Sequence, residues 1–147
     1  MSFSLDVSKF AKLTERRVQE TVNLVTIDMF SRIITKTPVD TGRLRGNWIP
    51  KKGSPDRGQY PYLDKSGQQA MVEIRAEFEN STADSHFLTN NLPYAAVVDY
   101  GLYPYGAETQ KTINGYSKQA PQGMVRTVVG KFDTAMKNAV AKTRRIK

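Results

Sequence analysis

TPVDTGRLRGNW, residues 37–48, is the stretch of sequence that decides the fold, because it follows a long helical pattern and leads into a predicted strand. Pro38 has no backbone N–H and disfavours the α conformation in the residue before it, so the preceding helix should end there. Asp40 and Thr41 can hydrogen-bond nearby backbone groups, and Gly42 tolerates a positive φ. Taken alone, the stretch predicts a tight turn in a helix–strand connection.

The helix before this turn is predicted from about residue 6 to residue 36, and its apolar surface is wider than one packing partner requires. At 100° per residue the apolar side chains cover an arc of roughly 200°, about twice the stripe of a helix buried on one side. One partner is expected to be the sheet of the same domain, and the other is either the C-terminal helix or a neighbouring subunit. Phe30 and Ile34 are therefore candidate subunit contacts. The charged part between Lys9 and Glu20 should project beyond the core.

Three segments after the turn are predicted to form an antiparallel sheet. The first covers residues 44–50, where Leu44 and Trp48 would share one face. The clearest covers residues 70–78, in which apolar and charged residues alternate. A further strand over residues 86–89 would pair with it as a hairpin.

The remaining segments predict one α+β domain over residues 1–147. It would have a long N-terminal helix and a C-terminal helix packed on a small antiparallel β-sheet, with long loops. Pro93 and Gly101 suit the start and the stop of a short helix over residues 94–100. Pro121 should open the last helix, residues 121–142. The loop over residues 51–69 is long enough that we expect it to order on assembly.

The composition favours an anionic partner and excludes thiol chemistry. The chain has 22 Lys and Arg against 14 Asp and Glu, a formal charge of +8, and no cysteine. Disulfides, thiol nucleophiles and thiolate metal sites are thereby excluded. No apolar run approaches the ~20 residues of a membrane span, so a soluble protein is expected. Nucleic acid is the obvious anionic partner, and the densest basic block, residues 142–147, is either a solvated end or a DNA contact.

Catalytic and metal-binding patterns do not emerge from the sequence. His86 is the only histidine and is expected to be structural, because one imidazole builds neither a histidine metal site nor a Ser–His relay without partners. Glu73 and Glu77, with Arg75 between them, fit a solvated strand face better than a catalytic carboxylate pair. We therefore expect a protein that is not an enzyme, with no catalytic, metal-binding or cofactor-binding residues and no cofactor.

Tyrosines gather in one part of the chain. Five of the seven lie between residues 94 and 116: Tyr94, Tyr100, Tyr103, Tyr105 and Tyr116. Tyrosine buries a large area at low entropic cost, which is typical of protein interfaces, and these five are candidate interface residues. Ordinary packing of a loop over the core explains the cluster as well. Stacking on single-stranded nucleic acid would require more interleaved Lys and Arg.

Residues 37–48 and the segment LPYAAVVDYG, residues 92–101, together resemble a family of small tail-completion or neck proteins, minor tail proteins of long-tailed double-stranded DNA bacteriophages. The resemblance covers nearly the whole chain in the order and spacing of its segments. It departs from the family pattern after Gly101, where LYPYG replaces a short Thr-rich loop. The positions that match the family motif are Pro38, Asp40, Thr41, Gly42, Leu44, Trp48, Pro93, Tyr94, Tyr100 and Gly101.

This resemblance implies a non-catalytic virion structural protein at the head–tail junction or the top of the viral tail, assembled in the host cytoplasm. Relatives act in rings that match the sixfold tail symmetry, which implies a hexamer. Its partners would be further copies of itself and other neck, head-connector and tail proteins, with non-specific contact to DNA in the channel and no contact with membrane. A basic nucleic-acid-binding module is the alternative, and a regulatory partner of a host enzyme is a third possibility.

Overall fold

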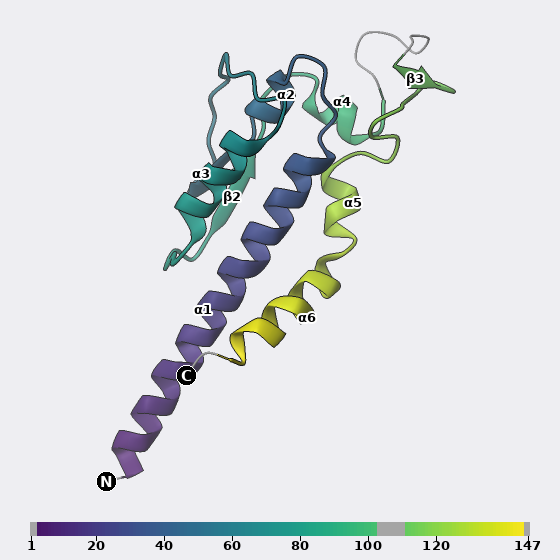
Figure 1. The fold of residues 1–147 in the computed structure, drawn as a ribbon. Helices are drawn as coiled ribbons and strands as arrows, with labels where there is room; N and C mark the ends of the chain where they lie inside the picture. Colours follow the sequence, from purple (N-terminus) through teal and green to yellow (C-terminus); the bar gives the residue numbers. More distant parts are fainter. Residues whose placement is uncertain (1–2, 103–110, 146–147) are drawn as a thin grey trace.

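The computed structural model describes residues 3–102 and 111–145, which form a long central helix flanked by two groups of smaller elements (Figure 1). The predicted α+β class is confirmed. In chain order the elements are α1 (Phe3–Lys36), α2 (Arg43–Gly46), β1 (Ile49–Lys52), α3 (Gln68–Phe78), β2 (His86–Thr89), α4 (Ala95–Asp99), β3 (Thr112–Ile113), β4 (Tyr116–Ser117), α5 (Val125–Val129) and α6 (Phe132–Thr143).

Helix α1 is covered from two sides, as its wide apolar arc requires. It packs against α3 on one side and against α5 and α6 on the other (Figure 1). The second partner is therefore the C-terminal part of the same chain. The helix ends at Lys36, as the proline at position 38 predicts. Its N-terminal part extends past both neighbours, in agreement with the predicted projection of the charged segment (Figure 1).

The sheet differs from the prediction in its strand pairing. Strand β2 lies at the predicted residues, but its antiparallel partner is β1, with Ile49 opposite Thr89 and Lys52 opposite His86. The strand predicted over residues 44–50 begins only at Ile49, and residues 44–46 belong to the helix α2 instead. The sheet packs mainly on α3, so the layers run from the sheet through α3 and α1 to α6.

The segment predicted as the clearest strand is the helix α3, so that prediction was wrong. Ala70, Ile74 and Phe78 are buried four residues apart, whereas Val72 is 62% exposed. This is helical periodicity, and the Ala, Met, Glu and Arg residues of the segment favour a helix. Asp64 precedes the helix and accepts hydrogen bonds from the backbone N–H groups of Gly67 and Ala70, at 2.8 and 3.2 Å.

The C-terminal helix is also shorter than predicted and is divided in two. The chain after Pro121 remains irregular until α5 begins at Val125. Gly130 and Lys131 then separate α5 from α6, where Lys131 leaves the helical region with φ −106° and ψ 16°. Glycine in a helix interior costs about 1 kcal/mol relative to alanine, which makes this the weakest point of the predicted helix.

The loop that was expected to order on assembly is held by the chain itself. Asn47 donates from Nδ2 to the carbonyl oxygen of Tyr60 and accepts at Oδ1 from its N–H, at 2.9 and 2.8 Å. Asn91 Nδ2 donates to the carbonyl oxygens of Asp56 and Gly58, at 3.1 and 2.9 Å. These side-chain amides replace the ladder bonds that an irregular segment lacks, so the loop finds hydrogen-bond partners within its own chain, and its ordering on assembly stays a prediction.

Candidate interface groove

A groove of about 490 Å³ separates the turn after α1 from the segment that contains α4 and the β3–β4 hairpin. Residues 38–44 line one wall, and Tyr94, Val98 and Leu102 contribute to the other. Residues 37–48 and 92–101, the two segments that resemble the phage family, therefore meet at one place on the surface, although they are far apart in the sequence.

The first wall is anchored by a buried hydrogen-bonded pair at the end of α1. Thr37 is almost completely buried, and its Oγ1 donates to the carbonyl oxygen of Ile33 at 2.7 Å. Thr37 Oγ1 also accepts a hydrogen bond from Trp48 Nε1 at 2.8 Å. The sequence predicted the helix end, but it placed Trp48 inside a strand that begins only at Ile49, and it did not indicate this bond.

The Arg45 side chain hydrogen-bonds to the backbone at the C-terminal end of α1. Its guanidinium donates to the carbonyl oxygens of Thr35 and Thr37, at 3.2 and 2.7 Å, and to that of Lys65 at 2.7 Å. It thus satisfies carbonyl groups that a helix end leaves without partners. Burial lowers the pKa of this guanidinium, and the nearby charge of Asp64 acts in the opposite direction.

Gly42 is required by both its backbone conformation and its surroundings. Its φ is +88°, and a Cβ at this position would lie 2.7 Å from the backbone nitrogen of Lys65. Its carbonyl oxygen also accepts a hydrogen bond from the N–H of Asp64 at 3.0 Å. Leu44, two residues later, is buried in the core. The turn therefore contacts the loop at Asp64 and Lys65 on one side and lines the groove on the other.

The two walls are joined by polar contacts. The side-chain amide of Gln119 accepts from the N–H of Val39 at 2.8 Å and donates to its carbonyl oxygen at 2.9 Å. Asp40 forms an exposed ion pair with Lys111 at 2.7 Å, instead of the backbone hydrogen bond expected from the turn. Thr41 does accept the N–H of Arg43, at 3.3 Å, as the turn predicts.

The second family-like segment contains a close crossing of two backbone stretches. Helix α4 follows Pro93, which is exposed, and it ends before Gly101, whose φ is +80° as its place at a helix stop predicts. A Cβ on Gly101 would overlap the carbonyl oxygen of Pro121, and one on Gly123 would overlap that of Asp99. Only glycine allows both approaches, so the end of α4 lies directly against the chain that enters α5.

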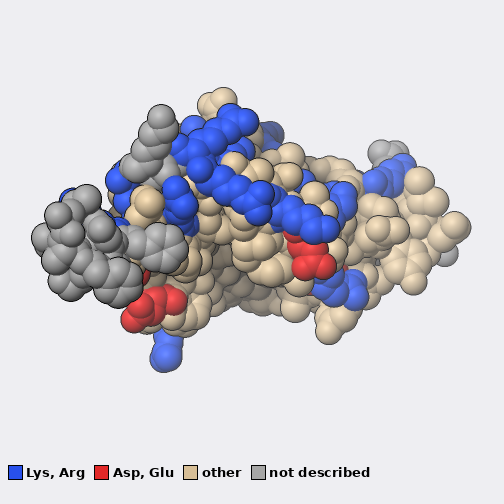
Figure 2. Space-filling model, turned by 90° about the horizontal axis from the view of Figure 1, so that it is seen from below, with Lys and Arg blue, Asp and Glu red and all other residues tan. Residues whose placement is uncertain are grey.

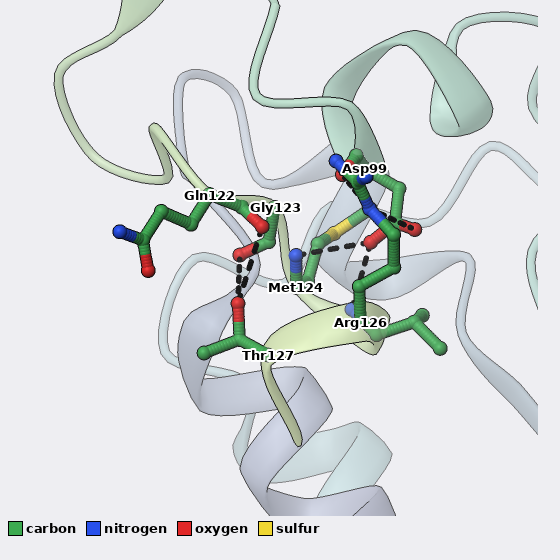
Figure 3. Close-up of polar contacts among 7 residues, drawn as sticks. Asp99, Gln122, Gly123, Met124, Arg126 and Thr127 are labelled. Carbon is green, nitrogen blue, oxygen red and sulfur yellow. Dashed lines mark hydrogen bonds and ion pairs between the residues drawn. The ribbon is translucent and has the colours of Figure 1, made fainter. Parts of the chain in front are cut away.

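Asp99, at the end of α4, hydrogen-bonds to the start of α5 and so joins the two backbone stretches (Figure 3). Its Oδ1 accepts hydrogen bonds from the backbone N–H groups of Met124 and Val125, at 3.0 and 2.8 Å, and so caps α5. Arg126 donates from Nε and Nη2 to the carbonyl oxygen of Asp99, at 3.1 and 2.8 Å, and its guanidinium lies 4.9 Å from the centre of the Tyr100 ring. This role of Asp99 was missed, because a cap supplied from 25 residues away leaves no local sequence signal.

An apolar surface flanks the groove on the side of α4 and the hairpin. Leu102 forms a β-bridge with Tyr116, which brings the end of α4 against β4. The exposed apolar residues of these elements, called the hairpin surface below, are Val97, Tyr100, Leu102, Ile113 and Tyr116. Exposed apolar side chains gathered in this way are typical of a protein contact.

The predicted interface tyrosines fall into three groups. Tyr100 and Tyr116 are at least half exposed and belong to the hairpin surface. Tyr94 is half-buried and lines the groove. Tyr103 and Tyr105 lie outside the described residues.

The structure excludes one of the two candidate contacts on α1 and leaves the other half-buried. Ile34 is completely buried in the core, so it is not available to a neighbouring subunit. Phe30 packs edge-to-face against Phe78, with 5.4 Å between the ring centres. Both residues belong to the part of the apolar arc that α3 covers, and the sequence pattern predicts α3 as a strand.

His86 occupies the structural position expected for it. Its ring hydrogen-bonds to Thr26 Oγ1 through Nδ1 at 2.9 Å and to Ser81 Oγ through Nε2 at 3.0 Å. It packs against Phe78, and burial lowers its pKa, with the positive charge of Lys52 acting in the same direction. Within residues 3–102 and 111–145, no three His, Cys, Asp or Glu side chains group closely enough to hold a metal ion.

In the part of the chain that the structure describes, no helix combines the length and apolar character that crossing a membrane requires. Comparison of the sequence with protein-family models and curated proteins, and of the fold with solved structures, found no match.

Proposed function

We propose that the protein is a non-catalytic structural component of a tailed bacteriophage virion, located at the head–tail junction or at the top of the tail. There it would act as a neck or tail-completion protein, assembled with copies of itself into a ring, for which six subunits would match the tail symmetry. The proposal rests on the resemblance of residues 37–48 and 92–101 to the tail-completion and neck family.

The observation that carries the proposal is the meeting of these two segments at the groove. Gly42 and Gly101 each occupy a position where a Cβ would strike the backbone of a neighbouring segment. Trp48 and Leu44 are buried beneath the same turn. The residues that suggested the family thus act together in building one surface, which is what a shared structural motif would do.

The hairpin surface is the proposed contact between subunits. Tyr100, Ile113 and Tyr116 are each at least half exposed, next to a groove already shaped by the fold. Burial of apolar area stabilises association by roughly 25 cal/mol per Å², so side chains of this size are effective contacts when a second copy covers them.

The first test is the mass of the protein in solution, measured by light scattering over a concentration series. We expect assemblies larger than a monomer, and the double variant Ile113→Ser/Tyr116→Ser should shift them toward monomer. Val72→Ser is the matched control, because Val72 is 62% exposed on α3, away from the hairpin surface. A monomer at every concentration, or equal weakening by the control, would contradict the proposed contact.

The second test addresses the location. Antibodies against the chain should label tailed particles at the junction between head and tail in electron micrographs of a lysate that contains the protein. Particles that carry no label, or that carry it only on the capsid surface or the tail tip, would refute the proposed position whatever the oligomeric state.

A further inference from the structure

The positive charge of the chain is concentrated in its last quarter. Residues 1–110 contain thirteen Lys and Arg and thirteen Asp and Glu, so they carry no formal net charge. Residues 111–147 contain nine Lys and Arg and a single acid, Asp133, so the whole formal charge of +8 lies there. Basic residues occur along the entire chain, and only a count that includes the acids reveals this asymmetry.

The fold places much of this charge on the exposed side of one helix. Helix α6 buries Ala135, Ala139 and Thr143, four residues apart, against α1. Thr143 also shares a hydrogen bond with Thr21 of α1, at 2.9 Å. The basic residues of α6 and its two ends are exposed, and we call them the α6 basic face: Lys131, Lys137, Lys142, Arg144 and Arg145.

Within residues 3–102 and 111–145, these five cations take part in no ion pair. The ion pairs of this part of the chain include Arg32 with Asp28, Lys111 with Asp40 and Arg126 with Asp99, all away from the α6 basic face. Figure 2 shows the molecule from the end where α1 projects. In this view Lys and Arg side chains form a continuous band, and they cover more of the surface than the acidic side chains do. Such a field attracts a polyanion.

The geometry favours nucleic acid over a membrane surface as the polyanion. An interfacial membrane helix inserts an apolar face into the lipid, and the small apolar face of α6 is already packed against α1. What remains exposed is a row of flexible cations from Lys131 to Arg145, about 21 Å long at 1.5 Å per residue. Over that length, one strand of duplex DNA presents a phosphate at about every 3.4 Å along the axis.

We propose that the α6 basic face binds the phosphate backbone of duplex DNA without reading its sequence. The inference does not depend on ring formation, because each copy of the chain carries the whole face. Lys and Arg side chains that contact phosphates displace condensed counterions, so the binding should have a steep dependence on salt. Five phosphate contacts give an expected slope of about −4.5 for the logarithm of affinity against the logarithm of salt concentration.

The test is fluorescence anisotropy of the full chain with two labelled 30-base-pair duplexes of unrelated sequence, between 50 and 200 mM salt. We expect equal affinity for both duplexes and a loss of about 500-fold across that salt range. The triple variant Lys137→Gln/Lys142→Gln/Arg144→Gln should reduce the slope by about 2.7, or about 0.9 for each lost contact.

The matched control removes three exposed cations elsewhere and leaves the same net charge: Lys51→Gln/Arg57→Gln/Lys65→Gln. It should retain most of the slope, and urea unfolding of both variants should confirm that they are folded. No binding at 50 mM salt, an equal loss in the control, or strong preference for one duplex would each overturn the proposal. Binding to vesicles of phosphatidylglycerol and phosphatidylcholine without binding to DNA would overturn it as well.

Discussion

Gly101→Ala offers a quantitative test of the backbone crossing behind the groove. The substitution has two costs, the positive φ of +80° and the overlap of the new Cβ with the carbonyl oxygen of Pro121. The first costs roughly 1–2 kcal/mol for a residue with a side chain. The second forces one backbone away from the other, which by analogy with overpacked cores adds about 1–3 kcal/mol. We expect a total loss of about 3 kcal/mol.

The two costs can be separated with glycines that share only the first. Gly53 and Gly115 have φ values of +77° and +82°, and a Cβ on either would have nothing within 4 Å. Alanine at these positions should therefore cost about 1 kcal/mol.

Trp48, the single buried tryptophan, provides the fluorescence signal for urea unfolding. For a slope near 2 kcal/mol per molar urea, Gly101→Ala should lower the midpoint by about 1.5 M and the controls by about 0.5 M. Equal shifts in all three variants would refute the close crossing.

Three further outcomes are expected from side chains that hold the fold. Asp99→Ala should reduce the free energy of unfolding by about 2 kcal/mol in thermal denaturation, and Asp99→Asn by less, because Asn retains the oxygen that caps α5. Thr37→Val should cost about 2 kcal/mol and shift the emission of Trp48, because the indole N–H loses its buried acceptor; Thr37→Ser should leave the emission unchanged. His86 has a pKa below its ordinary value of 6.5, so below that pH the unfolded chain binds the proton first and stability falls as the solution is acidified. The urea midpoint should therefore fall further between pH 7 and pH 5 for the wild type than for His86→Gln. Equal falls in the two proteins would exclude this contribution.

The turn at residues 37–48 was predictable because its causes are local. A proline that ends a helix and a glycine that permits positive φ act through the residues beside them. The same reasoning located Gly101 at the stop of a short helix. It could not reveal that both glycines face another backbone stretch, because those stretches lie more than 15 residues further along the chain.

The error at α3 had a specific cause. Ala70, Ile74 and Phe78 satisfy a period of two and a helical spacing of four equally well, so these three positions do not distinguish strand from helix. Val72 and Ala76 made the alternation convincing, although both are exposed in the structure. Helix propensity is the signal that favours the observed structure, and the alternation of apolar residues points the other way.

The groove itself lies beyond what such patterns can indicate. Its walls are joined by Gln119 and Val39, which are 80 positions apart, and its second wall is fixed by the cap from Asp99 to α5. Each contact uses a polar side chain that would be unremarkable on any surface. Their pairing depends on how α4 and α5 lie relative to α1, which is a property of the tertiary fold.

The placement of α6 on α1 also has a consequence for how the protein is made. Thr21 and Thr143, which meet across that contact, are 122 positions apart, so a ribosome must add all of the residues between them before α6 can dock. Until then, the side of α1 that α5 and α6 will cover remains open to water and to other nascent chains. Folding that depends on contacts between residues so far apart in the sequence is slow and prone to aggregation. Premature termination near Pro121 should therefore yield an insoluble fragment, even though the sheet, α3 and most of the core residues would already be present.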